Sequence, residues 1–232
     1  MDDKTVARES ELQKQLTAKG NNCLYVVFSS TPYKMGRFIR AMTRHRYNHV
    51  AVSLDPELRW LYSFARHYRN TPFYGGFVRE TPARYRYRGR VARIKVCAIP
   101  ITDVQRSELE TLLRGMKRAS RRYRYNLLSA TTVLFHRRVR LPNAYTCVEF
   151  VVDLIHRIAP EISLDPARTY SVHQLGEMFA KYEIYSGEFP ERDAVIRDGF
   201  DRKKPNFWQV IWLTLSSNCK LLASLFQKKT KE

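Results

Sequence analysis

Acidic side chains are scarce in this sequence of 232 residues. It contains 22 Asp and Glu against 41 Lys and Arg, which gives a formal net charge of +19. Such an imbalance favours anionic partners, for example nucleic acid or an acidic membrane surface. The alternative is a generally basic, well-solvated surface, because net charge alone specifies no partner.

Several motifs that indicate a particular chemistry are also absent. There is no GxxxxGK[ST] or GxGxxG pattern to support nucleotide binding, no HExxH and no CxxC pair. The four cysteines lie far apart, at Cys23, Cys97, Cys147 and Cys219. Four histidines show no zinc-site spacing: His45, His136, His156 and His173. We therefore expect no metal, no cofactor and no dense disulfide framework, and a reducing compartment fits best.

The N-terminal residues lack an apolar segment followed by a small-residue cleavage site, so no secretory signal is indicated and a cytoplasmic location is expected. Residues 8–18 can form a short polar helix. No internal repeat is visible. The expected organisation is a polar segment over 1–22, one domain over 23–200 and a basic, apolar helical segment over 201–232.

Hydrophobic residues make up 44% and aromatic residues 12% of the chain, which indicates a folded protein. A strand is predicted over 24–28, and an amphipathic helix over 33–46 with a basic outer side. NHVAVSLDPELRWLYSFAR then predicts two strands joined by a turn at 55–58. Helices are expected after Thr102 or Asp103, capped by one of them, and from Ser171. Helices mixed with an antiparallel sheet indicate an α+β fold.

Two segments between these elements have ambiguous patterns. HYRNTPFYGGFVRETP contains two prolines and a glycine pair, which predicts a loop, and RYRYRGRVARIKVCAIPI alternates basic and apolar residues as one long strand would. RYRYRGR at 84–90 and RRYRYN at 121–126 interleave aromatic and basic side chains, as surfaces that bind nucleic acid do. We favour the simpler interpretation, strands with a solvated face, and nucleic acid is the less favoured partner.

His49 begins the first strand of the predicted strand pair. Since side chains alternate along a strand, His49 shares one face with two small residues, Ala51 and Ser53, while Val50 and Val52 point the other way. A face of small residues lets another element approach closely. We expect a helix to dock on this face, with His49 at its rim.

The segment NAYTCVEFVVDLI, at residues 143–155, places a cysteine at the start of a helix. Thr146 and Glu149 match a capping box, which makes Thr146 the N-cap and Cys147 the first helical residue. The apolar stripe of this helix consists of Val148, Val151, Val152 and Ile155. Cys147 does not belong to that stripe.

A thiol in this position is a candidate nucleophile. The positive end of the helix dipole and the unpaired amides of the first turn favour a thiolate, and the same amides can hold an oxyanion. His49 is the best candidate for the base that a cysteine nucleophile needs. The alternative is that Cys147 is a small buried core residue, as many cysteines are.

NHVAVSLD, followed by LYSFAR, the GGFV segment and YTCVEFV, resembles the circularly permuted papain-like hydrolases of the NlpC superfamily. The similarity is to the YiiX/YaeF/YebB-like branch, distantly akin to the lecithin retinol acyltransferase group. It spans 24–155, and the YSVHQL segment fits it as well. It implies a permuted papain-like α+β fold, an antiparallel sheet packed against helices with the cysteine at a helix N-terminus. In those families the histidine opens a strand and precedes the cysteine.

The resemblance implies roles for three residues. Cys147 would be the nucleophile and His49 the general base of a thiol hydrolase, of amidase or peptidase type, or of an acyltransferase. The residue that orients the imidazole comes from the next strand, which places it at or near Ser63; His67 and Glu149 are alternatives. A serine is a weaker orienting group than a carboxylate, because it carries no charge to stabilise imidazolium. The substrate would be a peptide-like amide or a lipid acyl ester.

The C-terminal segment is largely apolar over 207–226 but is interrupted by polar residues, which disfavours a membrane-spanning helix. Basic clusters flank it, and Trp208 and Trp212 lie near one end. This composition is typical of an interfacial helix on an anionic membrane, and packing against the domain or a second subunit is the alternative. A second functional hypothesis follows: a basic, catalytically weak module that binds anionic membrane or nucleic acid.

Overall fold

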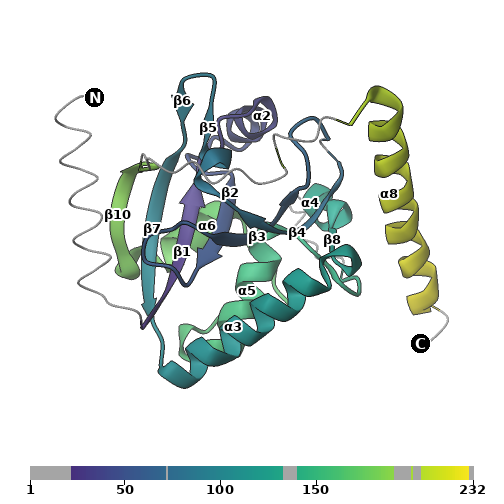
Figure 1. The fold of residues 1–232 in the computed structure, drawn as a ribbon. Helices are drawn as coiled ribbons and strands as arrows, with labels where there is room; N and C mark the ends of the chain where they lie inside the picture. The colour runs from purple at the N-terminus through teal and green to yellow at the C-terminus, as the bar shows by residue number, and fades with distance from the viewer. Residues whose placement is uncertain (1–21, 72, 133–139, 191–199, 201–204, 230–232) are drawn as a thin grey trace.

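The computed structural model describes residues 22–71, 73–132, 140–190, 200 and 205–229, and it is a mixed α+β structure built on one antiparallel sheet (Figure 1). The sheet has six strands in the order β10-β7-β1-β2-β3-β4. Their bounds are β1 Cys23–Ser29, β2 His49–Ser53, β3 Leu61–Arg66, β4 Gly75–Glu80, β7 Arg93–Pro100 and β10 Glu183–Glu188. The predicted α+β class is thus confirmed.

The helices include α2 Lys34–Thr43, α3 Asp103–Arg118, α4 Leu127–Thr132, α5 Cys147–Ile158, α6 Val172–Met178 and α8 Phe207–Lys229. Two small strand pairs, β5 Arg86–Tyr87 with β6 Arg90–Val91 and β8 Arg124–Tyr125 with β9 Ala144–Tyr145, complete the fold. In Figure 1, α3 and α5 lie below the sheet and α8 runs along one side of the molecule.

Side-chain caps start three of the helices as the sequence predicts. Full capping boxes are present at Thr102, Thr146 and Ser171, each with a Gln or Glu three residues later. Each cap provides acceptors for amides that the first helical turn leaves unpaired, and it thereby defines the helix start. The predicted helix at residues 8–18 lies outside the described residues.

Helix α5 does not dock where the strand pattern predicts. Its apolar side chains share a core with Val50 and Val52 of β2, whereas Ala51 belongs to a separate core on the other face of the sheet. The expectation that the small-residue face receives α5 is therefore wrong. The apolar stripe of α5 removes more surface from water against valines than it would against alanine and serine.

The segment predicted to be a loop contains strand β4, which pairs with β3 along its whole length. The glycine pair in it serves close packing. A Cβ at Gly76 would lie 2.3 Å from the carbonyl oxygen of Tyr123, and one at Gly75 would lie 2.6 Å from that of Ala65. The two glycines therefore allow neighbouring backbone to cross β4 closely, and the loop prediction is wrong for this stretch.

The long strand predicted over 84–101 is also interrupted. Its first part forms a short 3-10 turn and the β5–β6 hairpin, which turns at Arg88 and Gly89 with positive φ angles of 50° and 72°; β7 follows. Tyr85 is fully buried and stacks on Phe189 with ring centroids 4.4 Å apart. Its ring is consequently not an exposed platform for a nucleobase.

Helix α2 forms as predicted, but part of its apolar side faces solvent. Phe38 is 61% and Met42 62% exposed, while the only fully buried residue of the helix is Gly36. The α2 backbone lies too close to its neighbours for a side chain here: a Cβ at Gly36 would lie 2.0 Å from the Thr31 hydroxyl. The helix therefore packs through this glycine and leaves larger apolar side chains uncovered.

Candidate active site

Cys147 is the first residue of α5 and is almost completely buried. The Thr146 hydroxyl accepts the Glu149 amide at 3.1 Å, and the Glu149 carboxylate accepts the Thr146 amide at 2.7 Å. The sulfur therefore lies at the positive end of the helix dipole, as the sequence predicts. Glu149 is engaged in this cap, which explains its place in the motif.

His49 is the first residue of β2 and lies between two partners. Its Nε2 is 2.9 Å from Oε1 of Glu80, and its ring also hydrogen-bonds to the side chain of Cys147. With Nε2 occupied by the carboxylate, Nδ1 is the nitrogen left for the thiol. The structure thus brings Cys147 and His49 together across 98 residues of chain.

Glu80, the last residue of β4, is the group that orients the imidazole. Its side chain is buried, with 2% of the residue exposed. Ser63 donates a hydrogen bond to Oε1, the same oxygen that contacts His49, and the Tyr85 hydroxyl donates to Oε2 at 2.7 Å. Both carboxylate oxygens are therefore held, which fixes the ring orientation through His49 Nε2.

The sequence predicts that Ser63 orients the imidazole. In the structure Glu80 contacts the imidazole, and Ser63 contacts Glu80. His67, the other histidine considered, lies just beyond β3 and packs against Tyr74 with ring centroids 4.8 Å apart. Glu80 escaped the sequence analysis because its segment read as a loop. In a strand formed by GGFVRE, Val78 and Glu80 lie on the same face. Val78 is the cross-strand partner of Ser63, so Glu80 and Ser63 lie on that face together.

The buried pair of His49 and Glu80 carries opposite charges. Burial alone would lower the pKa of His49, but the Glu80 carboxylate and the hydrogen bonds to Cys147 and Glu80 outweigh it and raise this pKa to about 10. Burial would likewise raise the pKa of Glu80, but the charge of His49, followed by its hydrogen bond and the charge of Arg84, lowers it to about 2. At neutral pH the pair is imidazolium and carboxylate.

Hydrogen bonds from Arg40 of α2 and from Thr31, which follows β1, hold the start of β2 in place. Asn48, directly before His49, accepts hydrogen bonds on Oδ1 from the Thr31 amide at 3.0 Å and from Nη1 of Arg40 at 2.7 Å. Its amide nitrogen donates to the Thr31 hydroxyl at 2.9 Å. These bonds fix the backbone from which the His49 ring projects.

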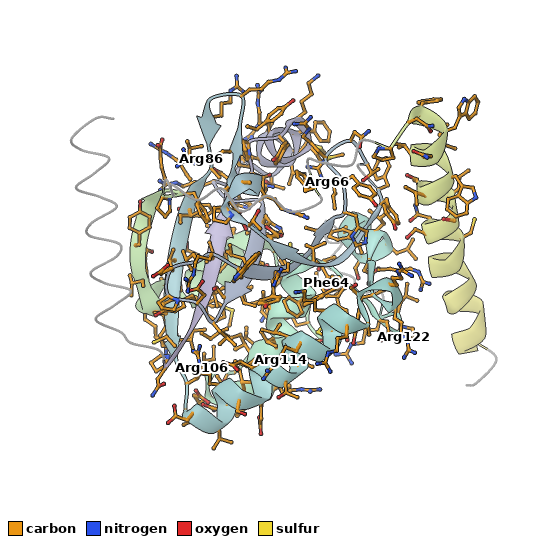
Figure 2. The ribbon with its side chains drawn as sticks, viewed as in Figure 1. Phe64, Arg66, Arg86, Arg106, Arg114 and Arg122 are labelled. Carbon is orange, nitrogen blue, oxygen red and sulfur yellow. The ribbon has the colours of Figure 1, made fainter. Side chains whose placement is uncertain are left out.

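The sulfur and the imidazole open onto a pocket of about 270 Å³. Its lining includes Glu80 and two arginines, Arg66 and Arg84. Among its apolar lining residues, Ile39 and Phe73 are exposed. Figure 2 shows Arg66 toward the loops at one end of the molecule and Phe64 deeper in the core. Other hollows, of about 350 and 590 Å³, have no cysteine among their lining residues.

Within the described part of the chain, no group of three His, Cys, Asp or Glu side chains is arranged to bind a metal ion. The described side chains that come together here are a thiol, an imidazole and a carboxylate. No family model, curated protein or solved structure matches the chain.

Proposed function

We propose that this chain is a cysteine-dependent acyl hydrolase or acyltransferase that acts on an amide or ester bond. The single observation that carries the proposal is the hydrogen-bonded series of Cys147, His49 and Glu80 at the N-terminus of α5. A permuted papain-like fold akin to the NlpC superfamily is proposed with it, since the order of histidine and cysteine agrees with that resemblance.

The chemistry follows from the roles of the three residues. The sulfur of Cys147 attacks the carbonyl carbon, and His49 transfers the thiol proton to the leaving amine or alkoxide as that bond breaks. Because Thr146 occupies the Glu149 amide, the amides of Cys147 and Val148 are the ones left near the sulfur to hold the oxyanion. The acyl thioester then passes to water or to another acceptor, which His49 deprotonates.

Glu80 contributes by keeping the imidazole charged and oriented. An imidazolium next to the sulfur stabilises the negative charge that the sulfur needs as a nucleophile. The carboxylate in turn stabilises the imidazolium, which a serine at the same place would not do. The substrate remains a peptide-like amide or a lipid acyl ester.

The proposal is tested by trapping the acyl-enzyme. Incubation of the protein with an activated ester, 4-nitrophenyl butyrate, is expected to release nitrophenol in a burst and to add one butyryl group to the peptide containing Cys147. Intact-protein and peptide mass spectrometry detect the adduct. The variant Cys147→Ser should show neither the burst nor the adduct. Equal acylation of Cys219, which is exposed, would contradict a specialised site at Cys147.

We propose membrane association as a second function, on the basis of exposed apolar side chains on α8. Trp208 is 75% and Trp212 68% exposed, with Phe207 and Leu215 also largely exposed. Within the described residues, no helix is long and apolar enough to cross a membrane. Exposed tryptophans on a strongly basic protein suit the interface of an anionic bilayer.

The membrane proposal predicts salt-sensitive binding to vesicles. Vesicles of phosphatidylcholine with phosphatidylserine should bind the protein, and Trp208→Ser combined with Trp212→Ser should weaken sedimentation at least about 10-fold. The matched control is Val104→Ser, which removes another exposed apolar side chain from α3. Unchanged binding by the tryptophan variant, or binding that raised salt leaves intact, would contradict the proposal.

A further inference from the structure

Two arginines lie in the pocket beside the thiol. Arg66 is the last residue of β3, and its carbonyl oxygen accepts a hydrogen bond from Nη1 of Arg84 at 3.0 Å. Both guanidinium groups lie against the ring of Phe200, with Cζ at 5.7 Å for Arg66 and 4.4 Å for Arg84. Arg84 is only 8% exposed. Two cations are thus held close together in a largely buried place.

Few acidic side chains are found among the described lining residues of this pocket. Glu80 is the only acidic residue among them, and its carboxylate already binds His49, Ser63 and Tyr85. This carboxylate also attracts Arg84 and Arg66. Among the described lining residues, one carboxylate therefore faces the imidazolium and two guanidinium groups.

Arg66 is the better placed of the two arginines to bind an anion, because its contacts within the described structure include no carboxylate ion pair. Its guanidinium donates to the carbonyl oxygen of Arg69 at 2.8 Å and lies against the ring of Tyr33 at 5.4 Å. Burial is the main cause that lowers the pKa of Arg66, and the charge of Arg84 acts in the same direction. A buried guanidinium with spare donors is costly unless an anion binds to it.

Tyr125 connects Arg66 to the nucleophile. It lines the same pocket, and its side chain interacts electrostatically with both Cys147 and Arg66. Arg66 and Cys147 both line this one pocket of about 270 Å³. The guanidinium and the sulfur are consequently in reach of one small ligand.

We infer that the acyl substrate carries an anionic group, a phosphate or a carboxylate, which Arg66 binds while Cys147 attacks the neighbouring carbonyl. This inference rests on the proposed function and adds the class of substrate. A planar guanidinium suits either anion, since it can donate two parallel hydrogen bonds to it. Neutral acyl compounds are then poorer substrates than anionic ones of the same size.

Two alkylating agents of nearly equal size test the inference. Iodoacetate is anionic and iodoacetamide is neutral; with either, the Cys147 sulfur forms a bond to carbon and iodide leaves. Peptide mass spectrometry measures each rate at Cys147, with exposed Cys219 as the internal reference. The iodoacetate to iodoacetamide ratio should be higher at Cys147 than at Cys219, and Arg66→Gln should lower it about 10-fold.

Three further measurements test whether Arg66 binds the anionic group. Arg66→Lys should retain part of the preference, and Arg93→Gln, which removes an exposed strand arginine outside the pocket, should retain all of it. Inorganic phosphate or acetate should slow the iodoacetate reaction, and the stronger competitor identifies the anion. A ratio at Cys147 that Arg66→Gln leaves unchanged, or protection by neither anion, overturns the inference. The proposed function fails separately, if iodoacetamide reacts no faster at Cys147 than at Cys219.

Discussion

Replacing His49 with alanine is expected to slow modification of Cys147 by iodoacetamide at neutral pH by about 100- to 1,000-fold. The imidazole is the only base hydrogen-bonded to the sulfur within the described structure, and its charge stabilises negative charge on that sulfur. Without it, the thiol should react no faster than an ordinary cysteine. Stopped-flow or mass-spectrometric rates from about pH 5 to about pH 10 would measure the loss.

A matched control separates this effect from general damage. His67 is also a largely buried histidine, and burial followed by the charge of Arg84 lowers its pKa to about 4, so it is neutral at the working pH. His67→Gln should therefore leave the Cys147 rate within about 2-fold of the original. His49→Gln keeps a side chain that can hydrogen-bond to Glu80, and it should still show the loss. Labelling of Cys147 that does not respond to either His49 variant would rule out the proposed base.

Replacing Glu80 with glutamine should reduce the same rate by about 10- to 100-fold. Burial opposes the positive charge on His49, and the Glu80 carboxylate is the largest single cause that raises the His49 pKa to about 10. Removing this charge should lower that pKa and leave the ring neutral at pH 7. NMR titration of the His49 ring measures the shift directly. Ser63→Ala removes one hydrogen bond to Glu80 but no charge, so the histidine should stay protonated in that variant.

The loss of stability caused by Glu80→Gln should also depend on pH. The raised His49 pKa stabilises the fold fully below the ordinary value of 6.5, and this contribution is lost as pH rises through about 10. The lowered Glu80 pKa stabilises the fold above the ordinary value of 4.5, and this contribution is lost as pH falls through about 2. The difference in unfolding free energy between wild type and variant should therefore be greatest between pH 4.5 and 6.5.

Urea denaturation inside and outside this pH window tests the stability prediction. Breaking a buried pair costs about 3 kcal/mol, so the difference should be of that order within the window. Glu183→Gln provides the control, because the Glu183 carboxylate pairs with Lys95 at 3.1 Å but is 37% exposed. Its effect should stay below about 1 kcal/mol. A Glu80 effect that does not vary with pH would contradict the charged pair.

Local chemistry is what the sequence determined by itself. The capping box of Thr146 and Glu149 placed Cys147 at a helix N-terminus, and the cap residues Thr102 and Ser171 marked the starts of α3 and α6. These features depend on residues three positions apart, whose contacts form within one helical turn. The α+β class followed from the alternation and periodicity of apolar residues in the same way.

The identity of the carboxylate that contacts His49 depends on strand pairing between distant parts of the chain. Glu80 reaches the ring because β4 pairs with β3 in one register, and Gly76 leaves room for the backbone of Tyr123 beside that strand. The exposure of Phe38 and Met42 was likewise decided by how close Gly36 brings α2 to Thr31. Such contacts join residues far apart in the chain, where side-chain period carries no information about which surfaces meet.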